Sequence, residues 1–149
     1  MLIGIDPVLS GELLKILDEM GHGDQLLLVD RNYPAAASGK PVIRLGEVTT
    51  VRAVTAILSV FPLDSFVERP LARMEVDNDP AIITDAQTAV LAIANDTMVT
   101  PIEFDIVPRF DFYERAKSVY AVVHTLDAKP YGCFILQKGV VFEQQLLVG

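Results

Sequence analysis

The chain has 149 residues, 51% of them hydrophobic, so it can bury a substantial core and does not resemble a disordered protein. Its formal net charge is −8 and no basic cluster occurs, which argues against nucleic acid and anionic membrane surfaces as partners. Cys133 is the only cysteine and there are two histidines, so an internal disulfide is excluded and we expect no metal site. A reducing, cytoplasmic location fits this cysteine usage best.

Two further features concern localisation and assembly. The N-terminus carries Asp6 and Pro7 and lacks a basic region, so we expect no signal peptide. The uncharged stretch 86–95 is too short to span a bilayer. The mean hydropathy of +0.38 is high for a small domain, and we therefore expect a homo-oligomer that buries apolar surface between subunits.

Helical and strand patterns alternate in the first half of the chain. Asp6 and Pro7 can start a helix whose apolar residues recur at helical spacing up to Met20, and Gly21 supplies its stop. The apolar run 25–29 predicts a buried strand. The other elements expected here are a strand over 41–45 and a helix that Thr49 or Thr50 caps and Pro62 ends.

The second half continues this alternation. We expect strands over 71–76, 103–107, 119–124 and 134–136, helices over 80–94 and 110–117, and a hairpin that pairs 134–136 with 139–142. No internal repeat or interdomain linker occurs. Because helices and strands interleave, we predict a single α/β domain over residues 1–149, although the pattern does not give the order of the strands.

A histidine between two glycines and an aspartate at a strand end form the first candidate site. Gly21 and Gly23 leave the imidazole of His22 on a tightly turned backbone that a small molecule can approach. Asp30 falls at the C-terminal end of the expected 25–29 strand, the edge of an α/β sheet where ligands usually bind. The pair suggests proton transfer, whereas the simpler interpretation is a histidine that interacts with the end of the preceding helix.

A second cluster, 108–117, combines charged and aromatic side chains. Aromatic rings can stack on the C–H faces of a sugar, and the guanidinium of Arg109 can donate to hydroxyl groups. The alternative is a solvated helix with a Glu114/Lys117 pair, and the residues alone do not decide between the two.

The third candidate is the turn 129–133, which leads into an apolar strand. Gly132 lets the backbone come near a ligand, and the hydroxyl of Tyr131 can donate or accept a hydrogen bond. Taken alone, this segment is a hairpin turn.

Other motifs do not indicate a bound group. Asp77, Asn78 and Asp79 resemble the start of a calcium loop, but the central glycine and terminal glutamate of an EF-hand are missing, so a turn explains them better. The glycines never form a phosphate-binding loop, and no serine has the context of a nucleophile elbow. We therefore expect no metal, nucleotide or other cofactor.

Together, these segments resemble the RbsD/FucU family of sugar mutarotases, and its fucose-mutarotase branch most closely. The likeness covers nearly the whole chain, in ordered blocks at the spacing of the family. The blocks are 13–15, 20–24, Asp30, 109–110 with 112–116, and 131–132 with 135–136 and 138–140. Residues 112–116 favour the fucose branch over the ribose branch.

The resemblance implies an RbsD-like fold with a mixed β-sheet flanked by helices, and a cofactor-free isomerase that interconverts the α and β anomers of a free monosaccharide, such as L-fucose. By motif, His22 matches the proton donor. Asp30, Arg109 and the backbone turn at Tyr131 and Gly132 match substrate-binding positions. The resemblance also implies ring-like homo-oligomers, commonly decamers, with sites near subunit boundaries.

Cys133 departs from the family pattern, in which asparagine usually follows Tyr-Gly. An asparagine side chain offers two donors and one acceptor, whereas a thiol offers one weak donor. We therefore expect Cys133 to shift the sugar preference or to weaken the enzyme, unless the thiol packs as a small hydrophobe.

Anomer exchange delivers one proton to the ring oxygen and removes one from the anomeric hydroxyl. An imidazole such as that of His22 suits the first task, and Tyr131, Asp30 or a held water can serve as the base. Two other hypotheses stay open: a non-catalytic sugar-binding or transport-associated protein, and a mutarotase for another sugar such as D-ribose.

Overall fold

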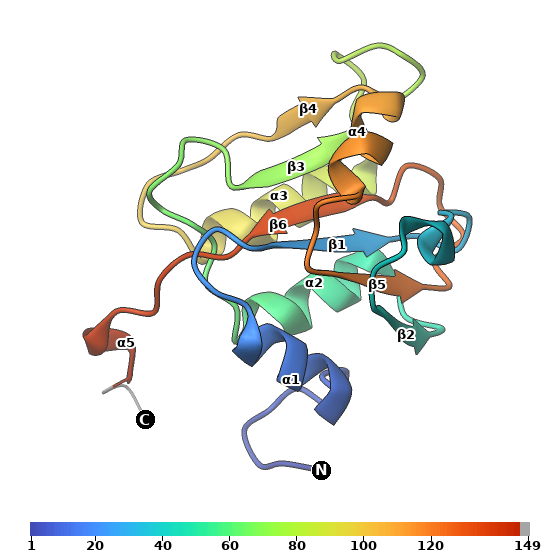
Figure 1. Ribbon diagram of the computed structural model, residues 1–149. Coiled ribbons are helices and arrows are strands. Elements are labelled where there is room, and N and C mark those ends of the chain that lie inside the picture. Colours follow the sequence, from blue (N-terminus) through green and yellow to red (C-terminus); the bar gives the residue numbers. More distant parts are fainter. Residues whose placement is uncertain (147–149) are drawn as a thin grey trace.

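The computed structural model describes residues 1–146 and is built around a six-stranded sheet (Figure 1). The strands are β1 (Gln25–Val29), β2 (Val42–Gly46), β3 (Leu71–Met74), β4 (Asp105–Val107), β5 (Ala121–Thr125) and β6 (Phe134–Gln137). Their spatial order is β2-β5-β1-β6-β3-β4. The mixed α/β fold is confirmed; residues 147–149, which belong to the expected domain, lie outside the described residues.

One strand runs against the other five. β5 pairs in parallel with β1 and β2, and β3 pairs in parallel with β4. β6 lies between β1 and β3 and is antiparallel to both. The C-terminal ends of β1 to β5 and the N-terminal end of β6 therefore share one edge of the sheet. We name this the carboxyl edge, and the opposite edge, where β1 begins, the amino edge.

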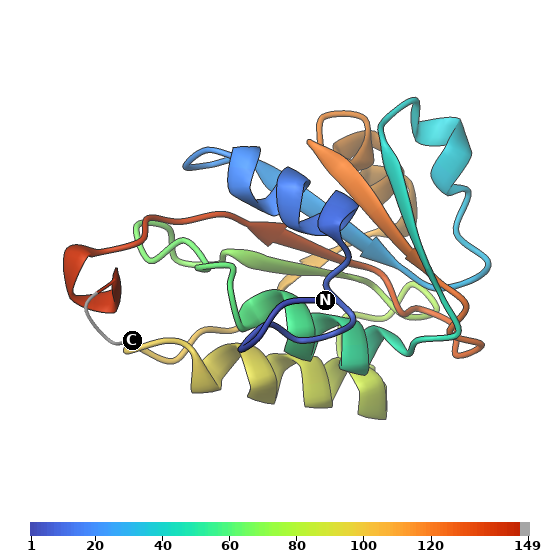
Figure 2. The ribbon, with the colours of Figure 1, turned by 90° about the horizontal axis from the view of Figure 1, so that it is seen from below.

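Helices cover both faces of the sheet. They are α1 (Gly11–Glu19), η1 (Ala35–Ser38), α2 (Thr50–Leu58), α3 (Asp85–Asp96), α4 (Arg109–Ala116) and α5 (Glu143–Leu146). Figure 2 shows α2 and α3 side by side on one face, with α4 on the other. Buried residues of α1, α2 and α3 form one hydrophobic cluster with the first face, and those of η1 and α4 form a second cluster with the other.

β1 contributes to both clusters, which explains why its residues 26–29 are all apolar. Leu26 and Leu28 enter the cluster of α1 to α3, whereas Leu27 and Val29 enter the cluster of α4. Alternate side chains of a strand point to opposite faces, so a central strand covered on both sides has no polar position.

Two helices begin later than the sequence pattern predicts, because other side chains cap them. The hydroxyl of Ser10 accepts from the Leu13 N–H, so α1 starts at Gly11 and leaves Asp6 outside the helix. Thr84 and Gln87 form a capping box, so α3 starts at Asp85 and not at residue 80. None of the helices within residues 1–146 is long and apolar enough to cross a membrane.

The predicted hairpin between 134–136 and 139–142 is wrong. β6 pairs with β1 and β3, and residues 139–142 form no strand. After β6 the chain instead contacts the segment that precedes β3: Lys138 forms an isolated bridge with Leu63, and the Gly139 N–H donates to the Pro62 carbonyl over 2.8 Å.

Candidate active site

Most of the residues singled out in the sequence meet at the carboxyl edge. Asp30 directly follows β1, and Arg109 begins α4 just after β4. Residues 131–133 directly precede β6, and they reach the same edge because β6 is antiparallel to its neighbours. The mixed sheet therefore brings together three segments that are far apart in the sequence.

Asp30 anchors the turn before β6. Its side chain is buried, and its Oδ2 accepts from the Gly132 N–H at 3.1 Å and from the Cys133 thiol at 3.7 Å. Its Oδ1 accepts from the Asn32 N–H at 2.9 Å. The approach is close, since a Cβ at Gly132 would lie 3.2 Å from Thr50 Cγ2 and 3.3 Å from Asp30 Cβ. Only glycine fits this position without displacing a neighbour.

Tyr131 has an unusual backbone conformation. Its φ of 59° lies in the left-handed region, which non-glycine residues adopt at a cost of roughly 1–2 kcal/mol. Its hydroxyl donates to Asp77 Oδ1 over 2.6 Å, and this hydrogen bond to a carboxylate raises the pKa of Tyr131. Asp77 and Asn78, in the turn after β3, are also left-handed, so strained backbone is concentrated at this edge.

Arg109 lies on the exposed start of α4 among aromatic rings. Its guanidinium is 5.7 Å from the ring centre of Phe110 and 5.6 Å from that of Tyr113. Its Nε donates to the Tyr113 hydroxyl at 3.2 Å, which raises the pKa of Arg109. The Glu114/Lys117 pair is present as well, at 2.7 Å between exposed side chains. One helix thus combines a solvated face with an arginine–aromatic cluster.

Cys133 does not face solvent. It is 3% exposed and belongs to the hydrophobic cluster of α4. Burial raises the pKa of its thiol well above the ordinary value, so the sulfur is protonated at neutral pH and donates to Asp30. Cys133 therefore contacts the carboxyl edge from the protein interior, through its hydrogen bond to Asp30.

His22 lies at the other edge of the sheet. It precedes β1 whereas Asp30 follows it, and the five residues of β1 span about 16 Å. Its side chain is 48% exposed, its Nε2 lies 3.1 Å from Asp64 Oδ1, and its ring centre is 5.3 Å from that of Phe66. Within one chain, His22 and Asp30 cannot touch the same sugar.

The loop that carries His22 is held by other side chains. Asp24 Oδ2 accepts from the Gly21 N–H at 2.7 Å, which makes Asp24 a cap of the turn. Lys138 donates to the carbonyls of Leu17 and Met20 at the end of α1. The side chain that donates hydrogen bonds to this helix end is therefore Lys138, whereas the imidazole of His22 contacts Asp64.

Asp64 is a functional candidate that sequence reasoning missed. It is 1% exposed, its Oδ1 also accepts from the Phe66 N–H at 3.0 Å, and its Oδ2 accepts from Gln137 Nε2 at 2.9 Å. Burial favours the neutral acid, but the hydrogen bonds from Phe66, Gln137 and His22 hold the pKa of Asp64 below its ordinary value. The imidazole thus has a buried carboxylate behind it.

Comparison with known proteins decides the family. A model of the RbsD / FucU transport protein family matches residues 3–141. The chain belongs to this family. An L-fucose mutarotase of Glaesserella parasuis serovar 5 is 44% identical to it, over 94% of this chain and 96% of that protein.

Two solved structures of RbsD/FucU type share the fold. The fucose mutarotase of Streptococcus pneumoniae in complex with L-fucose is 36% identical, covers 95% of this chain and 100% of its own, and has a TM-score of 0.87. FucU from Bifidobacterium longum is 38% identical, covers 93% of this chain and 99% of its own, and also has a TM-score of 0.87.

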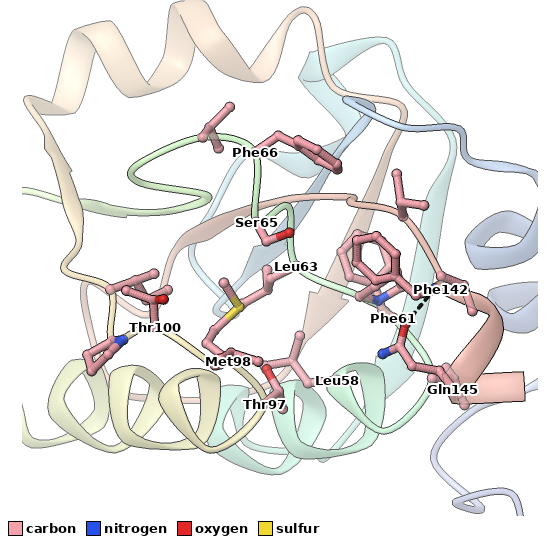
Figure 3. A pocket seen from close by; sticks show the side chains of 18 of the residues that line it. Leu58, Phe61, Leu63, Ser65, Phe66, Thr97, Met98, Thr100, Phe142 and Gln145 are labelled. Atoms are coloured by element: carbon pink, nitrogen blue, oxygen red, sulfur yellow. Dashed lines mark hydrogen bonds between the residues drawn. The ribbon is translucent and has the colours of Figure 1, made fainter. Parts of the chain in front are cut away.

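A cavity of about 920 Å³ opens at the amino edge of this RbsD/FucU chain (Figure 3). Its walls come from the segments that follow α2, α3 and β6, and they are mainly apolar, with the rings of Phe61, Phe66 and Phe142 among them. None of the candidate site residues named from the sequence, which are His22, Asp30, Arg109 and residues 131–133, lines it. The ring of Phe66 belongs to its wall and also lies beside the imidazole of His22, so this cavity is a neighbour of the candidate site and not the site itself.

Proposed function

We propose that this chain is an L-fucose mutarotase, an isomerase that interconverts the α and β anomers of the free sugar. The observation that carries the proposal is the match, over 95% of the chain, to a fucose mutarotase solved with L-fucose. Relatives that are 39–44% identical bear the same activity in their names. The residues expected to bind a sugar lie at the carboxyl edge of the sheet, and the residue expected to protonate it lies at the amino edge. Both edges belong to the same six-stranded sheet, whose last strand ends at Gln137.

We infer that a working site takes His22 from one chain and the carboxyl edge from another. The length of β1 supports this, because it separates the two groups within a chain. Exposed aromatic side chains stand at both places: Phe66 beside His22 is 66% exposed, and Phe110 beside Arg109 is 76% exposed. Contact between such surfaces would bury apolar area. A ring-like homo-oligomer, such as a decamer, repeats one head-to-tail contact of this kind.

In this site, the protons move in a closed cycle. His22 donates to the ring oxygen as the C1–O5 bond breaks, while a base takes the proton of the anomeric hydroxyl and the C1=O1 bond forms. The aldehyde rotates about C1–C2 and closes by the reverse steps, so no net proton or electron is consumed. Acid–base catalysis of roughly 10²–10⁴-fold, together with positioning, is enough for a reaction that also occurs unaided.

Tyr131 is our candidate for the base. Its hydroxyl donates to Asp77, so its oxygen can accept a proton from the sugar while its own proton shifts toward that carboxylate. The carboxylate of Asp30 already accepts three hydrogen bonds, which suits a role in holding the 131–133 turn against the sugar. Within residues 1–146, the Nη1 and Nη2 groups of Arg109 make no hydrogen bond, so they can donate to sugar hydroxyls.

We propose that the reaction needs no cofactor, since every step is a proton transfer between side chain and sugar. We also place the enzyme in the cytoplasm. The cysteine content supports this location, because a chain with a single cysteine forms no internal disulfide, which is typical of proteins in a reducing compartment.

The test is the rate of exchange between α and β anomer signals in NMR magnetisation-transfer spectra of L-fucose, D-ribose and D-galactose. We expect added protein to accelerate exchange for L-fucose most. Binding of a sugar with no acceleration would support the transport-associated or sugar-binding alternative, and a preference for D-ribose would correct the substrate.

The shared site has its own test in mixed oligomers. His22→Ala and Arg109→Ala chains should each be inactive alone. After they are dissociated and reassembled together, about a quarter of the sites should unite an intact His22 with an intact Arg109 by random mixing. A mixture as inactive as its components would show that each site belongs to one chain.

A further inference from the structure

The imidazole of His22 presents one nitrogen to the protein and leaves the other free. Nε2 lies 3.1 Å from the buried Oδ1 of Asp64. Nδ1 has no hydrogen-bond partner within residues 1–146. A carboxylate can only accept, so Nε2 must carry the proton in the neutral imidazole, and Nδ1 must hold the lone pair.

The carboxylate is held rigidly from the protein side. The Phe66 N–H and the Gln137 side chain fix its two oxygens, and Gln137 is itself held by the side-chain amide of Gln25 at 3.1 Å. At Gly139 the backbone approaches so closely that a Cβ would lie 2.7 Å from the Cα of Asp64. These contacts fix the orientation of the Asp64 carboxylate, and the half-exposed imidazole can take its own orientation from it.

We propose that Asp64 is a positioning residue for His22, and that Nδ1 is the nitrogen that exchanges a proton with the sugar. This inference rests on the proposed mutarotase function and names the reacting atom of its acid. When His22 is protonated, Nδ1–H donates to the ring oxygen, while Nε2–H stays on Asp64. After transfer, the same hydrogen bond keeps the lone pair on Nδ1, ready to take the proton back.

The first experiment reads the tautomer without using activity. The chain has two histidines, so labelling with ¹⁵N-histidine gives two imidazoles, and a His22→Gln variant assigns them. We expect neutral His22 to show a protonated Nε2 and an unprotonated Nδ1 as a single tautomer in the wild-type protein. Asp64→Ala should give a mixture of both tautomers, and a mixture in the wild-type protein would overturn the assignment.

The second experiment reads the consequence for catalysis. Asp64→Ala should lower kcat for anomer exchange on the order of 10- to 100-fold with little change in KM, because the imidazole is disordered while the sugar-binding edge is intact. Asp64→Asn should lose less, since its Oδ1 can still accept from Nε2–H once the side-chain amides of Gln137 and Gln25 both turn over. A kcat within twofold of wild type in Asp64→Ala would overturn the positioning role.

Asp24→Asn is the matched control. It removes a carboxylate from the same loop but keeps an oxygen for the Gly21 N–H, and it should change neither the tautomer nor kcat. If Asp64→Ala fails to fold, the wild-type tautomer and the Asp64→Asn rate still decide. A wild-type protein that shows the expected tautomer but accelerates no sugar would refute the proposed function while upholding the Asp64–His22 geometry.

Discussion

At the scale of single residues, the histidine that we propose as the proton donor contributes little to the fold. The side chain of His22 is half-exposed and lies in a loop that Asp24 and Lys138 hold without it. Its removal should therefore be tolerated structurally. His22→Ala is expected to lower the rate of anomer exchange by roughly 10²–10⁴-fold, the usual contribution of a general acid. NMR exchange rates measure this, with sedimentation as the control for assembly; full activity would contradict the assignment.

The thiol of Cys133 should be inert. It is buried, and burial raises its pKa, so both access and the thiolate fraction are low. We expect a colorimetric aromatic disulfide reagent to react with the folded protein far more slowly than with the protein in denaturant. Fast labelling under native conditions would show that the edge around Asp30 opens readily.

Candidate site residues with a distinctive local sequence could be predicted. Their hydrogen-bond partners far away in the sequence could not. His22 stands out between two glycines, and Asp30 stands out at the end of an apolar run. Asp64 and Asp77 sit 42 and 54 positions from the groups they bind, and nothing in their local sequence indicates a partner. Only the folded sheet brings these pairs together.

At the scale of elements, the contact between the end of β6 and the segment before β3 is the tightest backbone approach at any glycine within residues 1–146. A methyl group at Gly139 would lie 2.7 Å from the Leu63 carbonyl oxygen and from the Asp64 Cα. Gly139→Ala should lower the free energy of unfolding by about 1–3 kcal/mol through overpacking. Gly11→Ala, in the first turn of α1 with nothing within 4 Å, should raise it by up to about 1 kcal/mol.

Urea unfolding at one fixed protein concentration measures both variants. A Gly139→Ala protein as stable as wild type would show that the 62–64 segment can move away from β6, and the frame of Asp64 would then be loose.

The apolar runs identified the strands, but not their neighbours. The stretch 25–29 is apolar from Leu26 onward and forms β1 as predicted. The hairpin expected after β6 failed because a short apolar segment carries no information about what lies beside it. Residues 138–139 pair with 62–64, across a separation that local pattern cannot encode.

At the scale of the whole molecule, buried carboxylates set the response to acid. Asp127 accepts from the N–H and hydroxyl of Thr50 and from the Lys129 N–H. Burial opposes ionisation, but these hydrogen bonds and the charge of Lys129 hold the pKa of Asp127 below its ordinary value. The folded pKa of Asp64 is lowered too. Both carboxylates therefore stabilise the fold fully above the ordinary pKa of about 4, and this stability is lost as the pH falls through their folded values.

The midpoint of urea unfolding should accordingly fall as the pH drops below about 4. Asp127→Asn should be less stable at neutral pH, and its urea midpoint should fall less steeply as the pH drops below about 4. If the midpoints of the two proteins fell equally steeply, Asp127 would not contribute to the pH dependence.

His22 and Asp30 lie at opposite ends of β1, and the proposed site shared between chains would therefore couple sugar binding to assembly. In that proposed site a sugar would bind the associated chains and not the separated ones, so by mass action it would strengthen their association. L-fucose would then be both the substrate and a ligand that stabilises the oligomer. When the sugar is present, it would favour the associated, active form, and when the sugar is absent, the oligomer would dissociate more readily.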